Sequence, residues 1–293
     1  MPRTHPILPF FAAATGIATF SMMDATMKGA SIAAGVYSAL VIRNSFGSLL
    51  MLPVWLLSGA RRPGRDALKV HMLRSLVVTG MALLFFWGLV RIPIAEAIAL
   101  SFIAPLIALY LAAVLLGETI QTKAIVASLL GLAGVVVIAA ARLGDGTLDA
   151  QSGRGIAAVL TSAVLYAWNL ILQRQQAQLA SPQEIALFQN LFVALILSLA
   201  APWLLEWPSP AALRDIVLAA ALAGVSLLLL SWAYARAEAQ ALVPVEYSGF
   251  IWAALFGWLK FGETVTWATL VGVVLIVIGS WIAARKPTQM TAL

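Results

Sequence analysis

The chain of 293 residues contains no cysteine and few charged side chains. Without cysteine, a disulfide framework, an iron–sulfur cluster and thiol chemistry are excluded. Charged residues make up 10% of the chain, whereas soluble domains carry about 25%. The net charge of +6 is therefore better explained by basic loops beside a membrane than by a nucleic-acid-binding face, which needs a water-exposed domain.

Motifs of catalysis are missing as well. The sequence has no Gly-rich Lys-Ser/Thr phosphate loop, no Gly-x-Ser-x-Gly elbow and no cluster of acids and bases, which argues against an ATPase or a membrane enzyme. We expect the only two histidines, His5 and His71, to lie outside the membrane spans. A histidine metal site or proton relay is then not predicted, and no cofactor or metal is expected.

What the chain does contain is apolar sequence, at 62% of its residues. No soluble fold of this length has enough interior for so much apolar surface, so lipid must solvate much of it. A helix needs about 20 apolar residues to cross a bilayer, and the sequence offers ten such runs. The first is long enough to be an uncleaved span rather than a signal peptide. The predicted spans are roughly 7–30, 36–58, 70–90, 95–116, 122–141, 155–175, 184–205, 214–235, 240–260 and 265–284.

The sequence also repeats itself at an offset of 145 residues. The Gly-Glu-Thr sequence of residues 117–119 returns at 262–264, and Trp87 and Arg91 return as Trp232 and Arg236. We therefore divide the chain into two five-helix repeats, residues 1–149 and 150–293. Because five is odd, the second repeat must lie inverted relative to the first, which is typical of transporters whose substrate site lies between the halves. The predicted fold is all-α, with ten transmembrane helices around a central cavity.

Lysine and arginine set the predicted orientation. With both termini on one side, that side collects eleven basic residues and the other collects six. Cytoplasmic loops carry the excess of basic residues. We therefore expect a multi-pass protein of the bacterial inner membrane with both termini in the cytoplasm.

Charges inside spans are costly and tend to face protein or a water-filled cavity. Asp24 and Arg43 each lie about 10 Å from the outer ends of their spans, at 1.5 Å per residue, so they could meet. They could bind a zwitterion or form a structural ion pair, and Asp24 could instead hold Lys28 one turn away. Glu246 could receive a cationic group or a proton, or pair with Arg236.

Aromatic and polar neighbours complete the predicted site. Trp87, Trp168 and Trp232 could line the cavity or anchor helices at the membrane interface. The candidate substrate-binding residues are Asp24, Arg43, Asn44, Trp87, Ser101, Trp168, Asn169, Trp232, Glu246 and Tyr247.

A second set of residues is predicted to shape or gate the helices. Pro105 weakens the ladder of its span and could kink it, and Pro244 frees a backbone carbonyl or starts a helix. Glu118 and Glu263 follow spans four and nine, where we expect each to cap the next helix. The gating or structural candidates are Lys28, Pro105, Glu118, Pro244 and Glu263.

At these residues the chain resembles the drug/metabolite transporter superfamily, in its ten-span EamA-type branch. The matching features are Lys28 late in span one, Arg43 early in span two, Pro105 in span four and the two Gly-Glu-Thr turns. Within the superfamily the chain is most similar to the YddG-type amino-acid exporters of bacteria. The family often has a proline in span nine where this chain has Phe250. The resemblance implies a basket of ten helices around a central cavity and export of amino acids.

The expected function is that of an inner-membrane secondary transporter, not an enzyme, which exports small metabolites by alternating access. Aromatic or neutral amino acids are the first expected substrates. Riboflavin, S-adenosylmethionine, nucleotides and sugar conjugates remain alternatives, as does a membrane scaffold that transports nothing. The expected partners are a small-molecule substrate and the lipid bilayer, with no nucleic acid. A monomer is expected and a homodimer stays open, as do the coupling ion and the net direction of transport.

Overall fold

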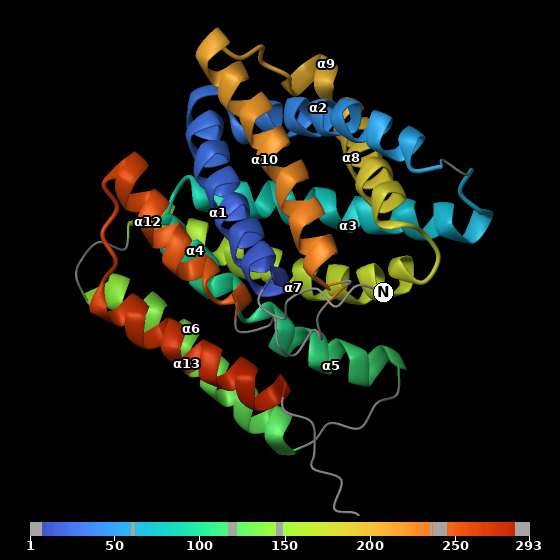
Figure 1. The fold of residues 1–293 in the computed structure, drawn as a ribbon. Helices are drawn as coiled ribbons and strands as arrows, with labels where there is room; N and C mark the ends of the chain where they lie inside the picture. The colour runs from blue at the N-terminus through green and yellow to red at the C-terminus, as the bar shows by residue number, and fades with distance from the viewer. Residues whose placement is uncertain are drawn as a thin grey trace, which may run out of the picture.

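A computed structural model describes residues 8–59, 62–116, 122–144, 149–234, 236 and 245–284. Within these ranges the chain forms helices joined by turns and no strand (Figure 1). The fold is therefore all-α, as the apolar runs predict. Two of the gating candidates, Glu118 and Pro244, lie outside the described residues.

The helices follow the predicted spans closely. They are α1 (Leu8–Ala34), α2 (Val36–Leu57), α3 (Arg65–Leu89), α4 (Ile94–Ser101), α5 (Ala104–Leu116), α6 (Thr122–Gly144), α7 (Ala150–Ala177), α8 (Pro182–Ser198), α9 (Ala201–Leu204), α10 (Pro210–Tyr234), α12 (Gly249–Phe261) and α13 (Trp267–Ala284). Five of them, α1, α2, α3, α7 and α10, are long and apolar enough to cross a membrane. Shorter apolar helices lie within the other predicted spans, so the count of ten spans stays a prediction.

Local chemistry explains several helix ends. The Asp149 carboxylate accepts from Ser152 N at 2.7 Å and starts α7 five residues before the predicted span. Ser181 caps α8, with proline at the first helical position. Gly262 ends α12 with φ at 64°, a left-handed conformation that glycine adopts without a steric penalty.

The span predicted at 95–116 is not one continuous helix. It breaks at Phe102 and Ile103, between α4 and α5. Pro105 follows the break and has no N–H to donate to the Ser101 carbonyl, four residues earlier. Pro105 was predicted to weaken and kink this span, and the structure shows a full interruption of the helix beside it.

The principal helix contacts join the first half of the chain to the second. Helix α1 packs on α10, α2 on α8, α3 on α7, α4 on α12, and α6 on α13 (Figure 1). When the halves are exchanged, α1 takes the place of α7, and α3 takes the place of α10. This exchange turns the α1–α10 contact into the α3–α7 contact. Each of the other three pairs maps onto itself. The packing therefore has the exchange symmetry that a duplicated unit requires.

Glycines allow two of these pairs to approach closely. A Cβ on Gly88 of α3 would lie 2.7 Å from the Gly155 carbonyl of α7, and one on Gly134 of α6 would lie 2.5 Å from the Gly272 carbonyl of α13. Such distances are too short for any side chain. Small residues therefore set the helix separation, as they commonly do between membrane helices.

Candidate functional site

A group of polar side chains lies in the interior, between helices of both halves. Asp24 of α1 is 2% exposed, and its charge interacts with that of Arg43 on α2. The structure thus brings together the two residues whose depths predicted a meeting. Tyr166 of α7 is within electrostatic range of Asp24 as well as of Arg74 and Glu246. Side chains from α1, α2, α7 and the turn before α12 therefore share one region, which we call the central polar group.

Tyr166 is 38% exposed although it lies within electrostatic range of charged groups from three other elements. Tyr166 was not among the candidate residues predicted from the sequence. The signal that could have found it is its spacing, because Tyr166 and Asn169 lie three residues apart on one helix face.

The turn before α12 meets the break between α4 and α5. The rings of Tyr247 and Phe102 form an edge-to-face contact with centroids 5.3 Å apart. Ser101, at the end of α4, donates from Oγ to the Ala97 carbonyl at 2.8 Å. The break between α4 and α5 thus touches the turn before α12 beside the central polar group, and interrupted helices are where many transporters bind solutes.

Lys28 has a different partner from the one considered in the sequence. Its Nζ lies 2.5 Å from Glu263 Oε1 and donates to the Ile92 carbonyl at 2.7 Å. The second oxygen, Glu263 Oε2, accepts from Ile94 N at 2.7 Å. Lys28 and Glu263 are 6% and 16% exposed in their side chains. We call this arrangement the clasp, and it joins α1, the α3–α4 turn and the end of α12.

The clasp corrects two expectations. Lys28 pairs with Glu263 rather than with Asp24, because the α3–α4 turn brings a carbonyl and a carboxylate to the same ammonium group. Glu263 caps an amide of α4, in the opposite half, rather than the helix that follows it. Thr266 takes the latter place, since its Oγ1 accepts from Thr269 N at 3.1 Å.

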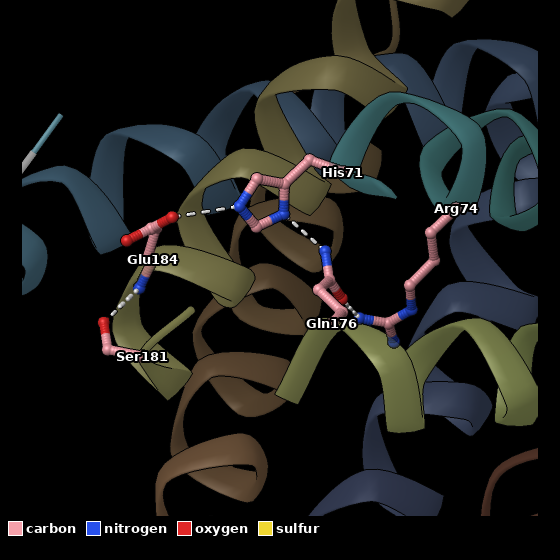
Figure 2. A network of polar contacts seen from close by, with 5 residues as sticks. All are labelled: His71, Arg74, Gln176, Ser181 and Glu184. Atoms are coloured by element: carbon pink, nitrogen blue, oxygen red, sulfur yellow. Dashed lines mark hydrogen bonds and ion pairs between the residues drawn. The ribbon is translucent and has the colours of Figure 1, made fainter. Parts of the chain in front are cut away.

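A second buried network lies near the start of α3 (Figure 2). His71 is fully buried, and its Nε2 lies 3.1 Å from Glu184 Oε1 on α8. Its Nδ1 contacts Gln176 Nε2 on α7, and Gln176 Oε1 accepts from Arg74 Nη1. We call His71, Arg74, Gln176 and Glu184 the His71 network. It joins α3 of the first half to α7 and α8 of the second.

The hydrogen bonds of the His71 network fix its donors and acceptors. Arginine only donates, so the oxygen of Gln176 must face Arg74 and its NH2 group must face His71. His71 Nδ1 is therefore an acceptor, and Nε2 carries the hydrogen that points at Glu184. Each polar atom that joins these three side chains thus has a matching partner.

His71 was expected outside the membrane spans, and that expectation is wrong, because His71 is fully buried within α3, one of the helices long and apolar enough to cross a membrane. Arg74 lies in the same helix. Three residues separate them, which places them on one face toward α7. Arg74 also donates from Nε to Asn169 Oδ1 at 2.8 Å, so the predicted Asn169 belongs to this network.

The other candidates divide between structural and exposed positions. Asn44 is buried and donates to the Leu40 carbonyl at 2.7 Å within its own helix. Trp168 is 40% exposed.

Trp87 and Trp232 are each followed, one helical turn later, by an arginine. The guanidinium of Arg91 lies 3.4 Å from the Trp87 ring centroid, and that of Arg236 lies 4.4 Å from the Trp232 centroid.

These paired stacks repeat in hydrogen bonding too. Arg91 Nη1 donates to the Trp87 carbonyl at 2.6 Å, and Arg236 Nη1 donates to the Trp232 carbonyl at 3.2 Å. The sequence repeat therefore reproduces the same local geometry twice. Among the residues that the structure describes, no group of three His, Cys, Asp or Glu side chains could hold a metal ion.

Known proteins resemble this chain over nearly its full length. The sequence profile of the EamA-like transporter family matches it twice, at residues 7–140 and 153–285. The pseudopaline exporter CntI of Pseudomonas aeruginosa is 28% identical over 265 residues, covering 89% of this chain and 90% of the exporter. A riboflavin transporter of Vibrio cholerae is 25% identical, with 94% and 92% covered.

Two further comparisons agree. An S-adenosylmethionine uptake transporter of Rickettsia prowazekii is 23% identical, covering 89% of this chain and 87% of that protein. A protein known from a crystal structure shares the fold with a TM-score of 0.65 at 22% identity, over 94% of this chain and 96% of that one. With both halves matched by the family, the chain belongs to the EamA-like transporters and is a multi-pass membrane transporter rather than an enzyme.

Proposed function

We propose that this protein exports small zwitterionic metabolites, amino acids first among them, across the bacterial inner membrane by alternating access. The observation that carries the proposal is the central polar group. It places a buried carboxylate, Asp24, within range of a guanidinium, Arg43, between helices of both halves. A solute with one ammonium and one carboxylate group would match this pair, and such a solute would offset the cost of holding charges in the interior.

The walls of the same region suit an amphipathic solute. Tyr166 lies within electrostatic range of the charges and is 38% exposed, so its ring is open to contact. Tyr247 and Phe102 present aromatic rings where the α4–α5 break meets the turn before α12. Aromatic faces bind apolar and aromatic groups with little demand for one shape. Neutral and aromatic amino acids therefore fit better than highly charged solutes.

Two closures on either side of the central polar group support alternating access. The clasp follows the end of α3, whereas the His71 network lies near its start. The 21 residues between His71 and Ile92 span about 30 Å along the helix direction, close to the thickness of a bilayer core. Both closures join one half of the chain to the other. We assign the clasp to the outer side and the His71 network to the cytoplasmic side, following the excess of basic residues near residues 62–74.

The names of the relatives support a transporter of small metabolites, although they differ in substrate and direction. One is named for pseudopaline export, one for riboflavin and one for S-adenosylmethionine uptake. These three solutes therefore belong in the substrate test beside the amino acids.

The proposal is tested by transport in liposomes that contain the purified protein. We expect labelled phenylalanine to exchange across the membrane, and Asp24→Asn or Arg43→Gln to lower its apparent affinity about tenfold, the loss of one charged contact. Asp215→Asn is the matched control, because Asp215 pairs with Arg214 and Lys260 at 3.7 Å in a partly exposed position. Transport of riboflavin, S-adenosylmethionine or pseudopaline without any amino acid would contradict the proposed substrate class.

A further inference from the structure

A cavity of about 710 Å³ lies beyond the clasp, away from the central polar group. Its walls come from the end of α1, the start of α2, the end of α3, the start of α7 and the segment after α9. Ser31 borders it and follows Lys28 by three residues, about 4.5 Å along α1. None of the residues of the central polar group lines this cavity. It is therefore a separate space on the far side of the clasp.

Ser31 and Ser75 are the two buried serines whose hydroxyls have no hydrogen-bond partner among the described residues, and Ser31 is 4% exposed. Several other helical serines donate to the carbonyl four residues earlier, as Ser48 and Ser101 do at 2.8 Å. A buried polar group without a partner is rare in folded proteins. Because Ser31 borders the cavity, rotation of its side chain would bring the hydroxyl to a ligand there, which would supply the missing partner.

Arg91 is held at the cavity wall with part of its guanidinium unused. Nη1 donates to the Trp87 carbonyl at 2.6 Å, Nε donates to Gln151 Oε1 at 3.2 Å, and one face stacks on the Trp87 ring. In the part of the chain that the structure describes, Nη2 has no acceptor. Partial burial, and then the like charge of Arg154, lower the pKa of Arg91 from its ordinary value. An anion bound there would offset both effects.

Glu206 provides the opposite charge in the same cavity. Its backbone N–H donates to Ser38 Oγ at 3.0 Å, which fixes the segment between α9 and α10. Its carboxylate forms no ion pair with Arg91, although both residues line the cavity. The ring of Tyr37 stands beside them, held by a hydrogen bond from its hydroxyl to the Leu197 carbonyl. The cavity thus offers one cation, one anion and two aromatic side chains.

We propose that this cavity is a binding site for zwitterionic solutes on the outer side of the membrane. Arg91 and Ser31 bind the carboxylate, Glu206 binds the ammonium group, and Trp87 and Tyr37 contact the apolar part. The inference rests on the proposed export of amino acids, for which it supplies the last site before release. Ser31 stands one helical turn from Lys28, so a solute that passes the opened clasp enters this site directly.

The experiment uses the absence of cysteine. Ile32 is 60% exposed and lines the cavity, so Ile32→Cys introduces a single thiol at its wall. Intact cells or right-side-out vesicles are treated with a membrane-impermeant maleimide, with increasing L-phenylalanine. We expect phenylalanine to slow the labelling. Phenylalaninamide, which lacks the carboxylate, and N-acetylphenylalanine, which lacks the ammonium charge, should protect far less.

Variants identify the residues that bind. In the Ile32→Cys background, Arg91→Gln and Glu206→Gln should each raise the phenylalanine concentration for half protection about tenfold, the effect of one charged hydrogen bond. Arg236→Gln is the matched control, since Arg236 forms the same stack on Trp232 without lining the cavity. Equal protection in all three variants, or equal protection by the three compounds, would overturn the site.

The result also separates this inference from the proposed function. Protection of the thiol without phenylalanine transport in liposomes would support the site and contradict the exporter. Transport without protection would support the exporter and contradict the site. A thiol at position 32 that reacts only from the cytoplasmic side would overturn the assignment of the cavity to the outer face.

Discussion

At the scale of single residues, the interior charges find their partners across the two halves of the chain. Lys28 meets Glu263, which is 235 residues away in sequence, and Arg74 meets Gln176. Breaking a buried pair by removing one partner is strongly destabilising, because the remaining charge stays buried alone. Such contacts therefore hold the halves together in the observed state, and any movement of the halves must exchange them for others.

The clasp gives a prediction at this scale. Lys28→Met should lower the free energy of unfolding by about 3 kcal/mol, because Glu263 loses its cation while buried. The double variant Lys28→Met/Glu263→Met should lose less than the sum of the single variants, since no charge then remains unpaired. Thermal unfolding of the purified protein in lipid nanodiscs measures these differences.

The control for this comparison of single and double variants is the Lys69–Asp66 pair, whose side chains are 79% and 84% exposed. Exposed pairs contribute little to stability, so Lys69→Met should leave the unfolding temperature unchanged. Additive losses for Lys28 and Glu263 would show that the two residues act independently and that the clasp is not a pair.

Sequence reasoning reached some of these residues and missed others for a physical reason. Asp24 and Arg43 were found because helical rise gives the depth of a residue directly. Tyr166 and the partners of Arg74 were missed because they depend on contacts between α3 and α7, which lie about 95 residues apart in the sequence and leave no local pattern. The Lys28–Glu263 contact depends on tertiary packing and has no local pattern.

At the scale of elements, the helix positions were predictable, whereas their continuity and crossings were less so. Apolar runs of about 20 residues located a helix in every predicted span. Pro105 predicted the weak point of the fourth span, and the structure breaks the helix there. The break between α8 and α9 at Leu199 and Ala200 was not predicted. The helix crossing at Gly134 and Gly272 could not be predicted, because the three-dimensional packing decides which helix faces meet.

The α6–α13 crossing gives a prediction at this scale. Gly134→Ala should destabilise the protein by about 1–3 kcal/mol, because its Cβ would lie 2.5 Å from the Gly272 carbonyl and the helices must separate. Gly80→Ala in α3 is the control, since its Cβ would meet Leu165 Cδ1 at an ordinary 3.4 Å. That change should be neutral or stabilising, because alanine favours helix. If Gly134→Ala and Gly80→Ala shift the unfolding temperature by the same amount, the close crossing is contradicted.

At the scale of the whole molecule, the contacts between halves carry the account of function. The principal helix pairs keep their pattern when the halves are exchanged, and the Trp–Arg stacks recur in both halves. A structure with this symmetry can adopt a second state in which the halves trade environments, which is how inverted repeats achieve alternating access. The clasp and the His71 network are then the contacts that open in turn. This movement, and the export that it would support, remain proposals.

The most direct test of this central claim uses one thiol between the two closures. Tyr166→Cys places the only cysteine of the chain in the central polar group, where Tyr166 is 38% exposed. Labelling with a membrane-impermeant maleimide is compared in right-side-out and inside-out vesicles. We predict that adding Lys28→Met increases labelling from the outside, that adding Gln176→Leu increases labelling from the cytoplasmic side, and that the exposed Gln175→Leu changes neither. Equal increases from both sides in either background, or no change in both, would contradict alternating access.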